Sequence, residues 1–164
     1  IETTDDLEKL AAVESNKDAT APNGSSIAFL LEFGGHSCLF AADAFATVLY
    51  PALSWIARSR GLERLEIDAF KLPHHGSRGN VLSPLFDVVR AKNYLVSTSG
   101  ARFEHPDDEA IARVITLGGP GHTIWFNYSS PQTLKWAEKR FTSRYEYGTE
   151  YPKSAAGGVT LELS

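Results

Sequence analysis

Three points along the chain carry residue types that can bind a metal ion or transfer a proton. They are Asp43, the adjacent pair His74 and His75, and His105. A carboxylate oxygen and imidazole nitrogens suit a divalent ion such as Zn²⁺ or Mn²⁺, because such ions accept both hard oxygen and softer nitrogen donors. Histidine also exchanges protons near neutral pH. These residue types therefore indicate metal-assisted or acid–base chemistry.

Each of these residues also has an ordinary structural explanation. Asp43 precedes an expected helix, where aspartate is a preferred N-cap residue. His105 lies in a loop, where a histidine is as often structural as functional. The turn that contains His74 and His75 is harder to explain structurally, since two adjacent imidazoles followed by glycine are an uncommon end to a loop. Ser77, in the same turn, could bind a phosphate or cap the turn.

The two remaining histidines are expected to be solvent-facing turn residues. His36 follows the glycine pair of an expected hairpin, and His122 stands beside Gly121. The chain shows no nucleophile triad, phosphate-binding glycine loop, cysteine cluster or dinucleotide fingerprint. The chemistry is therefore expected at Asp43, His74, His75 and His105.

The elements that must position these residues alternate between strands and helices. Apolar runs predict strands over residues 26–33, 37–42, 66–72, 94–97, 123–126 and 157–163, and helical spacing predicts helices over residues 44–59, 83–90, 106–117 and 130–141. This alternation indicates an α/β fold with helices on at least one face of the sheet. The candidate residues follow three of these strands, so we expect them together where strands end, the usual place for chemistry in α/β folds.

Composition is consistent with one compact domain and excludes some functions. The chain has 164 residues, of which 43% are hydrophobic, and a formal charge of −4, which argues against a broad cationic surface for nucleic acid. The single cysteine, Cys38, is expected in the core, and the absence of a possible disulfide fits a reducing compartment. No apolar run approaches the ~18 residues of a membrane span, and no signal peptide begins the chain. A cytoplasmic protein without membrane contact is expected.

The chain is expected to have two parts. Residues 1–24 are polar and charged, and we expect a mobile linker there; residues 25–164 form the domain. The chain begins with Ile1 and contains no methionine, so we expect it to be a piece of a longer product.

Four segments, taken in order, resemble the metallo-β-lactamase superfamily, and within it the branch of the ComEC competence DNA-uptake hydrolase domains. The matching segments are residues 23–33, residues 38–44, the run Lys-Leu-Pro-His-His-Gly-Ser at 71–77, and residues 96–106. The closing residues 149–161 are also similar. The resemblance covers residues 23–163, and Leu-Pro-His-His-Gly-Ser is its most specific element.

The resemblance implies the C-terminal half of an αββα metallo-β-lactamase sandwich, with one or two Zn²⁺ or Mn²⁺ ions between its sheets. In such enzymes an aspartate in the position of Asp43 bridges the metals, and histidines like His75 and His74 are ligands or proton donors. His105 is implied as a catalytic or metal residue or as a contact to a substrate phosphate, with Ser77 as a second phosphate contact. A metal-bound water then attacks a phosphodiester or another ester, so a nuclease or phosphodiesterase is implied.

Departures from the family pattern concern the metal ligands. The His-x-His-x-Asp-His signature, which supplies most ligands in the family, is missing, and Ala41-Ala42-Asp43 replaces the more usual Thr-Gly-Asp. This chain alone should therefore bind metal poorly, and it should expose an apolar sheet face.

Two explanations stay open for the incomplete ligand set. In the first, an N-terminal half of the same protein or a companion chain completes the enzyme, which acts on DNA, RNA or a nucleotide, with an associated protease or larger complex as a further partner. In the second, the domain is a degenerate, noncatalytic assembly or regulatory subunit.

Overall fold

The computed structural model describes residues 5–154 and 158–163, and within them one mixed six-stranded sheet carries the fold. The elements in chain order are α1 (Asp5–Ala11), α2 (Ala21–Gly24), β1 (Phe29–Phe33), β2 (His36–Phe40), α3 (Ala46–Ser59), β3 (Leu65–Lys71), the 3-10 turn η1 (Pro73–Gly76), α4 (Leu85–Val88), β4 (Val89–Val96), α5 (Asp108–Leu117), β5 (Thr123–Phe126), α6 (Pro131–Leu134), η2 (Lys135–Ala137), α7 (Lys139–Tyr145) and β6 (Gly148–Glu150).

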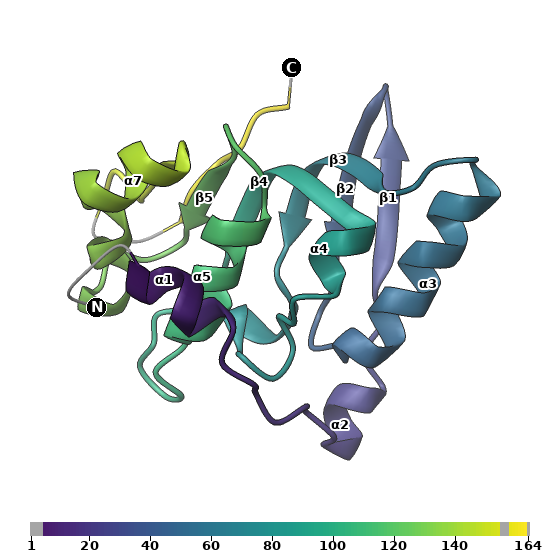
Figure 1. Cartoon of the computed structure of the whole chain (residues 1–164), viewed down its shortest axis with the longest axis horizontal. Coiled ribbons are helices and arrows are strands. Elements are labelled where there is room, and N and C mark those ends of the chain that lie inside the picture. Colours follow the sequence, from purple (N-terminus) through teal and green to yellow (C-terminus); the bar gives the residue numbers. More distant parts are fainter. Residues whose placement is uncertain (1–4, 155–157, 164) are drawn as a thin grey trace.

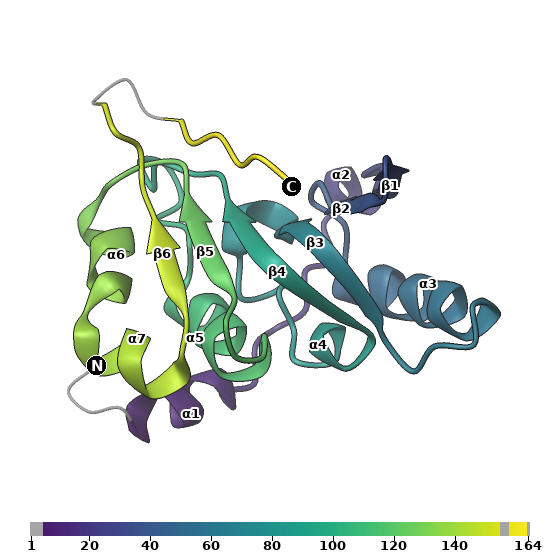
Figure 2. The ribbon, with the colours of Figure 1, turned by 90° about the horizontal axis from the view of Figure 1, so that it is seen from above.

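The strands lie in the sheet in the order in which they occur in the chain (Figure 1). β1 and β2 form an antiparallel hairpin, and β2 to β6 run parallel. Successive right-handed crossovers in one direction place their helices on one face, and Figure 2 shows α3, α4 and α5 together on that face. The expected α/β class, with a mixed sheet and flanking helices, is confirmed.

The core lies between the sheet and these helices. Phe70 of β3, Tyr94 of β4 and Phe126 of β5 are fully buried, as are Ile111 and Val114 of α5. Burial of each such side chain stabilises the fold by about 1.5–3 kcal/mol. This packing fixes where each strand ends along the edge of the sheet. It therefore also fixes the positions of the loops that follow the strands.

The opposite face of the sheet has a row of register partners that crosses four strands and is apolar except for one lysine. Phe40, Lys71, Leu95 and Trp125 are register partners from β2 to β5. A groove of about 490 Å³ runs over this row, and Cys38, expected in the core, is a half-buried residue of its lining. The last described residues cross this face (Figure 2), and three of them line the groove: Val159, Leu161 and Leu163.

Residues 5–24, expected as a linker, contain α1 and α2 and pack against the domain. Leu7 is fully buried, and α1 lies beside α5 (Figure 1). The buried guanidinium of Arg113 in α5 donates hydrogen bonds to the carbonyls of Ala11 and Val13 and to the hydroxyl of Ser15. The anchoring groups are mostly main-chain carbonyls, which composition does not reveal. Residues 1–4 of the expected linker lie outside the described residues.

The helix expected over residues 83–90 forms only in part, over Leu85–Val88. α4 has four residues and β4 begins at Val89, which pairs with Leu65 of β3. Val88 and Val89 are β-branched, and pairing with a buried neighbouring strand outweighs the apolar spacing that suggested a helix.

The expected terminal strand is also absent from the described residues 158–163, while residue 157 lies outside them. The last strand of the described sheet is instead β6, which pairs with β5. No helix within the described ranges is both long and apolar enough to cross a lipid bilayer.

Candidate active site

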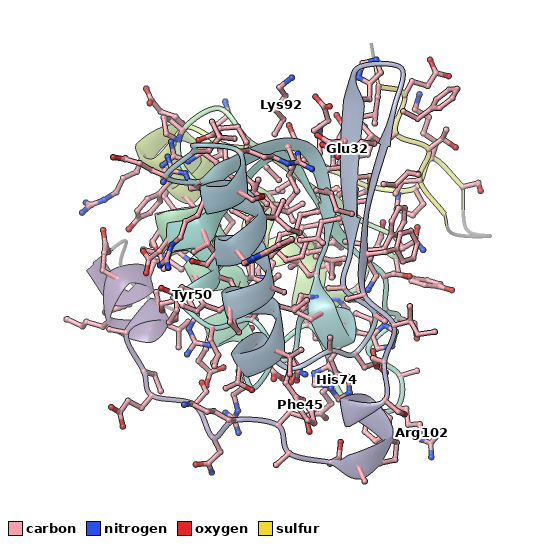
Figure 3. The ribbon with its side chains drawn as sticks, turned by 90° about the vertical axis from the view of Figure 1, so that its right-hand side faces the viewer. Glu32, Phe45, Tyr50, His74, Lys92 and Arg102 are labelled. Atoms are coloured by element: carbon pink, nitrogen blue, oxygen red, sulfur yellow. The ribbon has the colours of Figure 1, made fainter. Side chains whose placement is uncertain are left out.

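The three candidate points meet at one end of the sheet. β2, β3 and β4 are parallel neighbours, so the loops after them leave from the same edge. The amide of His74 donates a hydrogen bond of 2.8 Å to the carbonyl of Ala42, which joins the loops after β3 and β2. Figure 3 shows His74, Phe45 and Arg102 at this end of the molecule, opposite Glu32 and Lys92.

The backbone at this edge is held in an uncommon conformation. Ala42, His74, His75 and Glu104 all have positive φ, between 43° and 58°. Non-glycine residues rarely adopt this region, and such conformations persist where the surrounding structure enforces them, often at functional sites. The concentration of these residues in three adjoining loops marks this edge as the candidate active site.

Gly76 allows the loop after β3 to contact the loop after β4. Its φ is 83°, and a Cβ placed on it would lie 2.9 Å from the Cβ of Pro106. Its carbonyl accepts a 3.0 Å hydrogen bond from the amide of Asp107. The His74-His75 turn and the His105-Pro106 turn, whose peptide bond is cis, are thereby in direct contact.

The imidazole of His74 is held by residues from the N-terminal segment and from its own loop. Its Nδ1 lies 3.2 Å from Asp18 Oδ2, 3.2 Å from Asn80 Oδ1 and 3.2 Å from Asn23 Nδ2. The amide of Asn80, a fully buried residue, also donates to Asp18 Oδ2 at 3.1 Å and to the carbonyl of Asp43 at 3.3 Å. One amide side chain thus connects the Asp43 loop, the His74 loop and the N-terminal segment.

The carboxylate of Asp18 is 9% exposed, and it accepts several hydrogen bonds. Burial by itself would raise its pKa, but hydrogen bonds from Thr20, Asn23 and Asn80 together hold the pKa of Asp18 well below its ordinary value. It therefore stays ionised beside His74.

His75 is held by a backbone carbonyl. Its Nδ1 lies 2.5 Å from the carbonyl oxygen of Ser97, at the end of β4. A carbonyl can only accept, so Nδ1 must carry the proton, which leaves Nε2 with a free lone pair when the ring is neutral. The side chain is otherwise exposed at the sheet edge.

His105 is oriented in the same way by a carboxylate. Its Nδ1 lies 3.2 Å from Asp107 Oδ1, and its side chain is 14% exposed. Burial would raise the pKa of Asp107, but hydrogen bonds from His105 and from the amide of Arg78 lower it overall. The ring of His74 lies between the other two, with centroids 5.4 Å from that of His105 and 6.2 Å from that of His75.

Asp43 lies in the loop before α3 but does not cap that helix. The N-cap residue is Phe45, which makes no side-chain capping hydrogen bond, so the structural explanation of Asp43 as an N-cap is wrong. Asp43 is half-buried, and its amide donates to Ser26 Oγ at 3.3 Å. Its charge acts on Lys71: desolvation lowers the pKa of Lys71, and Asp43 partly offsets this effect.

Ser77 has a structural role in the turn. Its Oγ accepts a hydrogen bond from the amide of Gly79 at 3.3 Å, and its carbonyl accepts from the amides of Asn80 and Val81. The turn-capping alternative for Ser77 is therefore observed, and a phosphate contact stays a prediction.

The other two histidines lie away from this cluster. His36 is partly exposed, with Nδ1 3.6 Å from Asp68 Oδ2. His122 was expected to face solvent, and this prediction is wrong: it is 2% exposed and stacks on Tyr147 with centroids 5.6 Å apart. Burial lowers the pKa of His122. The neighbouring glycines suggested an exposed turn, but the aromatic residues of β4 and of the segment before β6 enclose the ring.

Sequence reasoning missed Asp18, Asn23 and Asn80. All three hold His74, yet two of them lie in or next to the expected linker. A weak local signal exists, because Asp18 two residues before Thr20 forms a side-chain turn with the Thr20 amide. Nothing local connects that turn with a histidine 56 positions away.

A metal ion would find only part of its ligand set here. The hydrogen bonding of His75 and His105 is of the kind found at metal sites, since metal-binding histidines usually present one nitrogen while a protein acceptor holds the other N–H. However, in the part of the chain that the structure describes, no three or more His, Cys, Asp or Glu side chains are grouped so that they could hold a metal ion.

Comparison of the chain with protein-family models, curated proteins and solved structures finds no match. Function is therefore inferred from the chemistry of the site.

Proposed function

We propose that this chain is the histidine-bearing part of a metal-dependent hydrolase of metallo-β-lactamase type, acting on phosphodiesters of nucleic acids or nucleotides. The observation that supports the proposal best is that all three imidazoles make their hydrogen bonds through Nδ1. His75 and His105 each have Nδ1 against an acceptor, and His74 has Nδ1 against Asp18 and Asn80. His75 and His105 therefore keep Nε2 for a ligand or a proton, and His74 does so in the tautomer whose Nδ1 donates to Asp18.

The missing metal donors would come from a segment with the His-x-His-x-Asp-His signature, in the same protein or in a companion chain. His75, His74 and Asp43 would add to those donors, with His105 beside them. The apolar face of the sheet supports this assembly, because a second sheet packed on Phe40, Leu95 and Trp125 would bring its own loops to the same edge. A bound Zn²⁺ or Mn²⁺ would supply a water of lowered pKa.

The chain's own residues would orient the imidazoles and exchange protons. Asp107 holds the N–H of His105, so that Nε2 of the neutral ring can accept a proton and the protonated ring can return it to a leaving oxygen. Asp18 would hold the Nδ1–H of His74 in the same way, because its carboxylate stays charged. We place this enzyme in the cytoplasm, a reducing compartment in which Cys38 would stay a free thiol.

The test is co-expression of this chain with a polypeptide that carries the signature segment. We expect one or two metal ions per assembled protein by elemental analysis, and metal-dependent cleavage of DNA or of a small phosphodiester. Asp43→Ala should reduce both metal content and cleavage by at least tenfold. Asp87→Ala is a matched control, since this exposed aspartate lies in α4, outside the candidate site.

An assembled protein without metal would exclude the enzymatic proposal. The noncatalytic alternative predicts a stable complex with no cleavage in the presence of any divalent ion. The incomplete ligand set within the described residues is the observation that favours this alternative.

A further inference from the structure

An exposed aromatic side chain lies directly beside the candidate catalytic histidines. Phe103 is 63% exposed, in the loop that leads from β4 to His105. Its ring centroid is 6.2 Å from that of His105, at an interplanar angle of 35°. The guanidinium carbon of Arg102 lies 4.9 Å from the centroid of the same ring. The exposed ring therefore has the guanidinium of Arg102 against it and the imidazole of His105 beside it.

The loop that carries this pair is braced by its own hydrogen bonds. The Gly100 amide donates to Thr98 Oγ1 at 3.1 Å, and the Ala101 amide donates to Ser99 Oγ at 3.4 Å. The Glu104 amide then donates to the Gly100 carbonyl at 3.0 Å. Ordering a loop costs conformational entropy, so a loop already braced around an exposed phenylalanine loses less of it when a ligand binds.

We propose that Phe103 and Arg102 form a stacking site for the nucleobase of a nucleotide or single-stranded nucleic acid, whose phosphate lies toward His105. This inference rests on the proposed function, whose substrate class it narrows. Flat bases stack on aromatic rings and on arginine guanidinium planes, and this recognition is tolerant of sequence. A nucleotide suits the geometry because one sugar separates its base from its phosphate.

Local charge also favours a base at this position. Glu104 and Asp107 follow the aromatic ring in the chain, so an anionic peptide would be repelled from this loop, whereas Asp108 is paired with Lys135. An uncharged base avoids this repulsion, and the positive guanidinium of Arg102 adds a cation–π component to the stack. The nearby imidazoles would offset the remaining repulsion on the phosphate in the chain alone, and a metal ion would add to this effect in the assembled site.

The test compares two probes that differ only by a base. Adenosine 5′-monophosphate and ribose 5-phosphate would be titrated into the full chain and followed by NMR chemical shifts. We expect adenosine 5′-monophosphate to bind about tenfold more tightly, and Phe103→Ala to remove this difference. Phe103→Tyr should keep it. Phe33→Ala is the matched control, because Phe33 is 84% exposed at the hairpin end of β1, where it pairs with His36 and not with the loops that carry His75 and His105.

Equal affinity for the two probes, no detectable binding of either, or full binding by Phe103→Ala would overturn the stacking site. If the phenyl ring instead receives an aromatic side chain of a protein partner, neither probe will show base-dependent binding. Binding that depends on Phe103 in an assembled protein that contains no metal would leave the stacking site intact and refute the hydrolase. The two proposals can therefore fail separately.

Discussion

At the scale of single residues, the candidate site depends on backbone conformations that few side chains tolerate. Gly76 combines a φ of 83° with a close approach to Pro106, and both features are needed to bring His75 and His105 into neighbouring turns. Gly121 has a similar φ of 78° but has no neighbour within 4 Å of an added Cβ. Substitution of these two glycines by alanine therefore distinguishes two destabilising effects. Both variants have the unfavourable backbone conformation, but only the variant at position 76 also has the steric contact.

Gly76→Ala should therefore destabilise the fold more than Gly121→Ala does. Each alanine has to occupy the left-handed region, at a cost of about 1 kcal/mol, and at position 76 the added methyl also collides with Pro106. We expect Gly76→Ala to lower the free energy of unfolding by about 2–4 kcal/mol in urea titrations. Equal losses for the two variants would contradict this prediction, because they would show that Pro106 can move away from the added methyl group without cost.

At the scale of elements, Arg113 of α5 connects the N-terminal segment to the candidate site. Its guanidinium donates to Ala11, Val13 and Ser15 on one side and to the carbonyls of Arg78 and Val81 on the other. The same segment continues to the aspartate that holds the His74 ring. A buried charge with five acceptors has no equivalent substitute, because lysine cannot reach them in the same planar arrangement.

Arg113→Met should loosen the N-terminal segment, since the carbonyls lose their donor and α1 keeps its apolar contacts and the ion pair of Glu8 with Arg144. We expect a loss of about 3 kcal/mol or more in unfolding free energy, and faster hydrogen exchange over residues 5–20. Arg60→Met is the control: this arginine is 42% exposed and pairs with Glu32, itself 48% exposed, so its loss should cost less than about 1 kcal/mol. Unchanged exchange over α1 in Arg113→Met would contradict the connecting role.

At the scale of the whole molecule, stability should fall in acid in two stages. The pKa of buried His122 is lowered in the folded protein, so the unfolded chain takes up a proton first as the pH falls below about 6.5. The pKa values of Asp18 and Asp107 are also lowered, and their contribution is present above about pH 3.9 and is lost as the pH falls toward their folded values. Both effects have the same sign.

Unfolding free energy measured between pH 8 and pH 3 should therefore decrease toward acid, with a slope of up to about 1.4 kcal/mol per pH unit for each group that titrates. His122→Phe keeps an aromatic ring against Tyr147 and should flatten the curve just below pH 6.5, while the stage below pH 4 persists. His36→Phe is a control at a partly exposed histidine. A curve for His122→Phe that parallels the unaltered protein would disprove the first stage.

The sequence alone determined the fold class and the edge of the sheet at which the candidate residues lie. Alternating apolar runs specify strands and helices locally, and the carboxyl ends of parallel strands share an edge, so Asp43, His74, His75 and His105 could be placed near one another without coordinates.

Only the tertiary structure decided which groups hold those residues and which histidine is buried. Asp18 contacts His74 across 56 positions, and Arg113 contacts Ala11 across 102. The burial of His122 also depends on tertiary packing. Its turn-like sequence predicted a solvent-facing side chain, but Tyr94 and Tyr147 pack around the ring. Periodicity reports what a residue's neighbours in the chain prefer, whereas these contacts depend on how separate segments pack together.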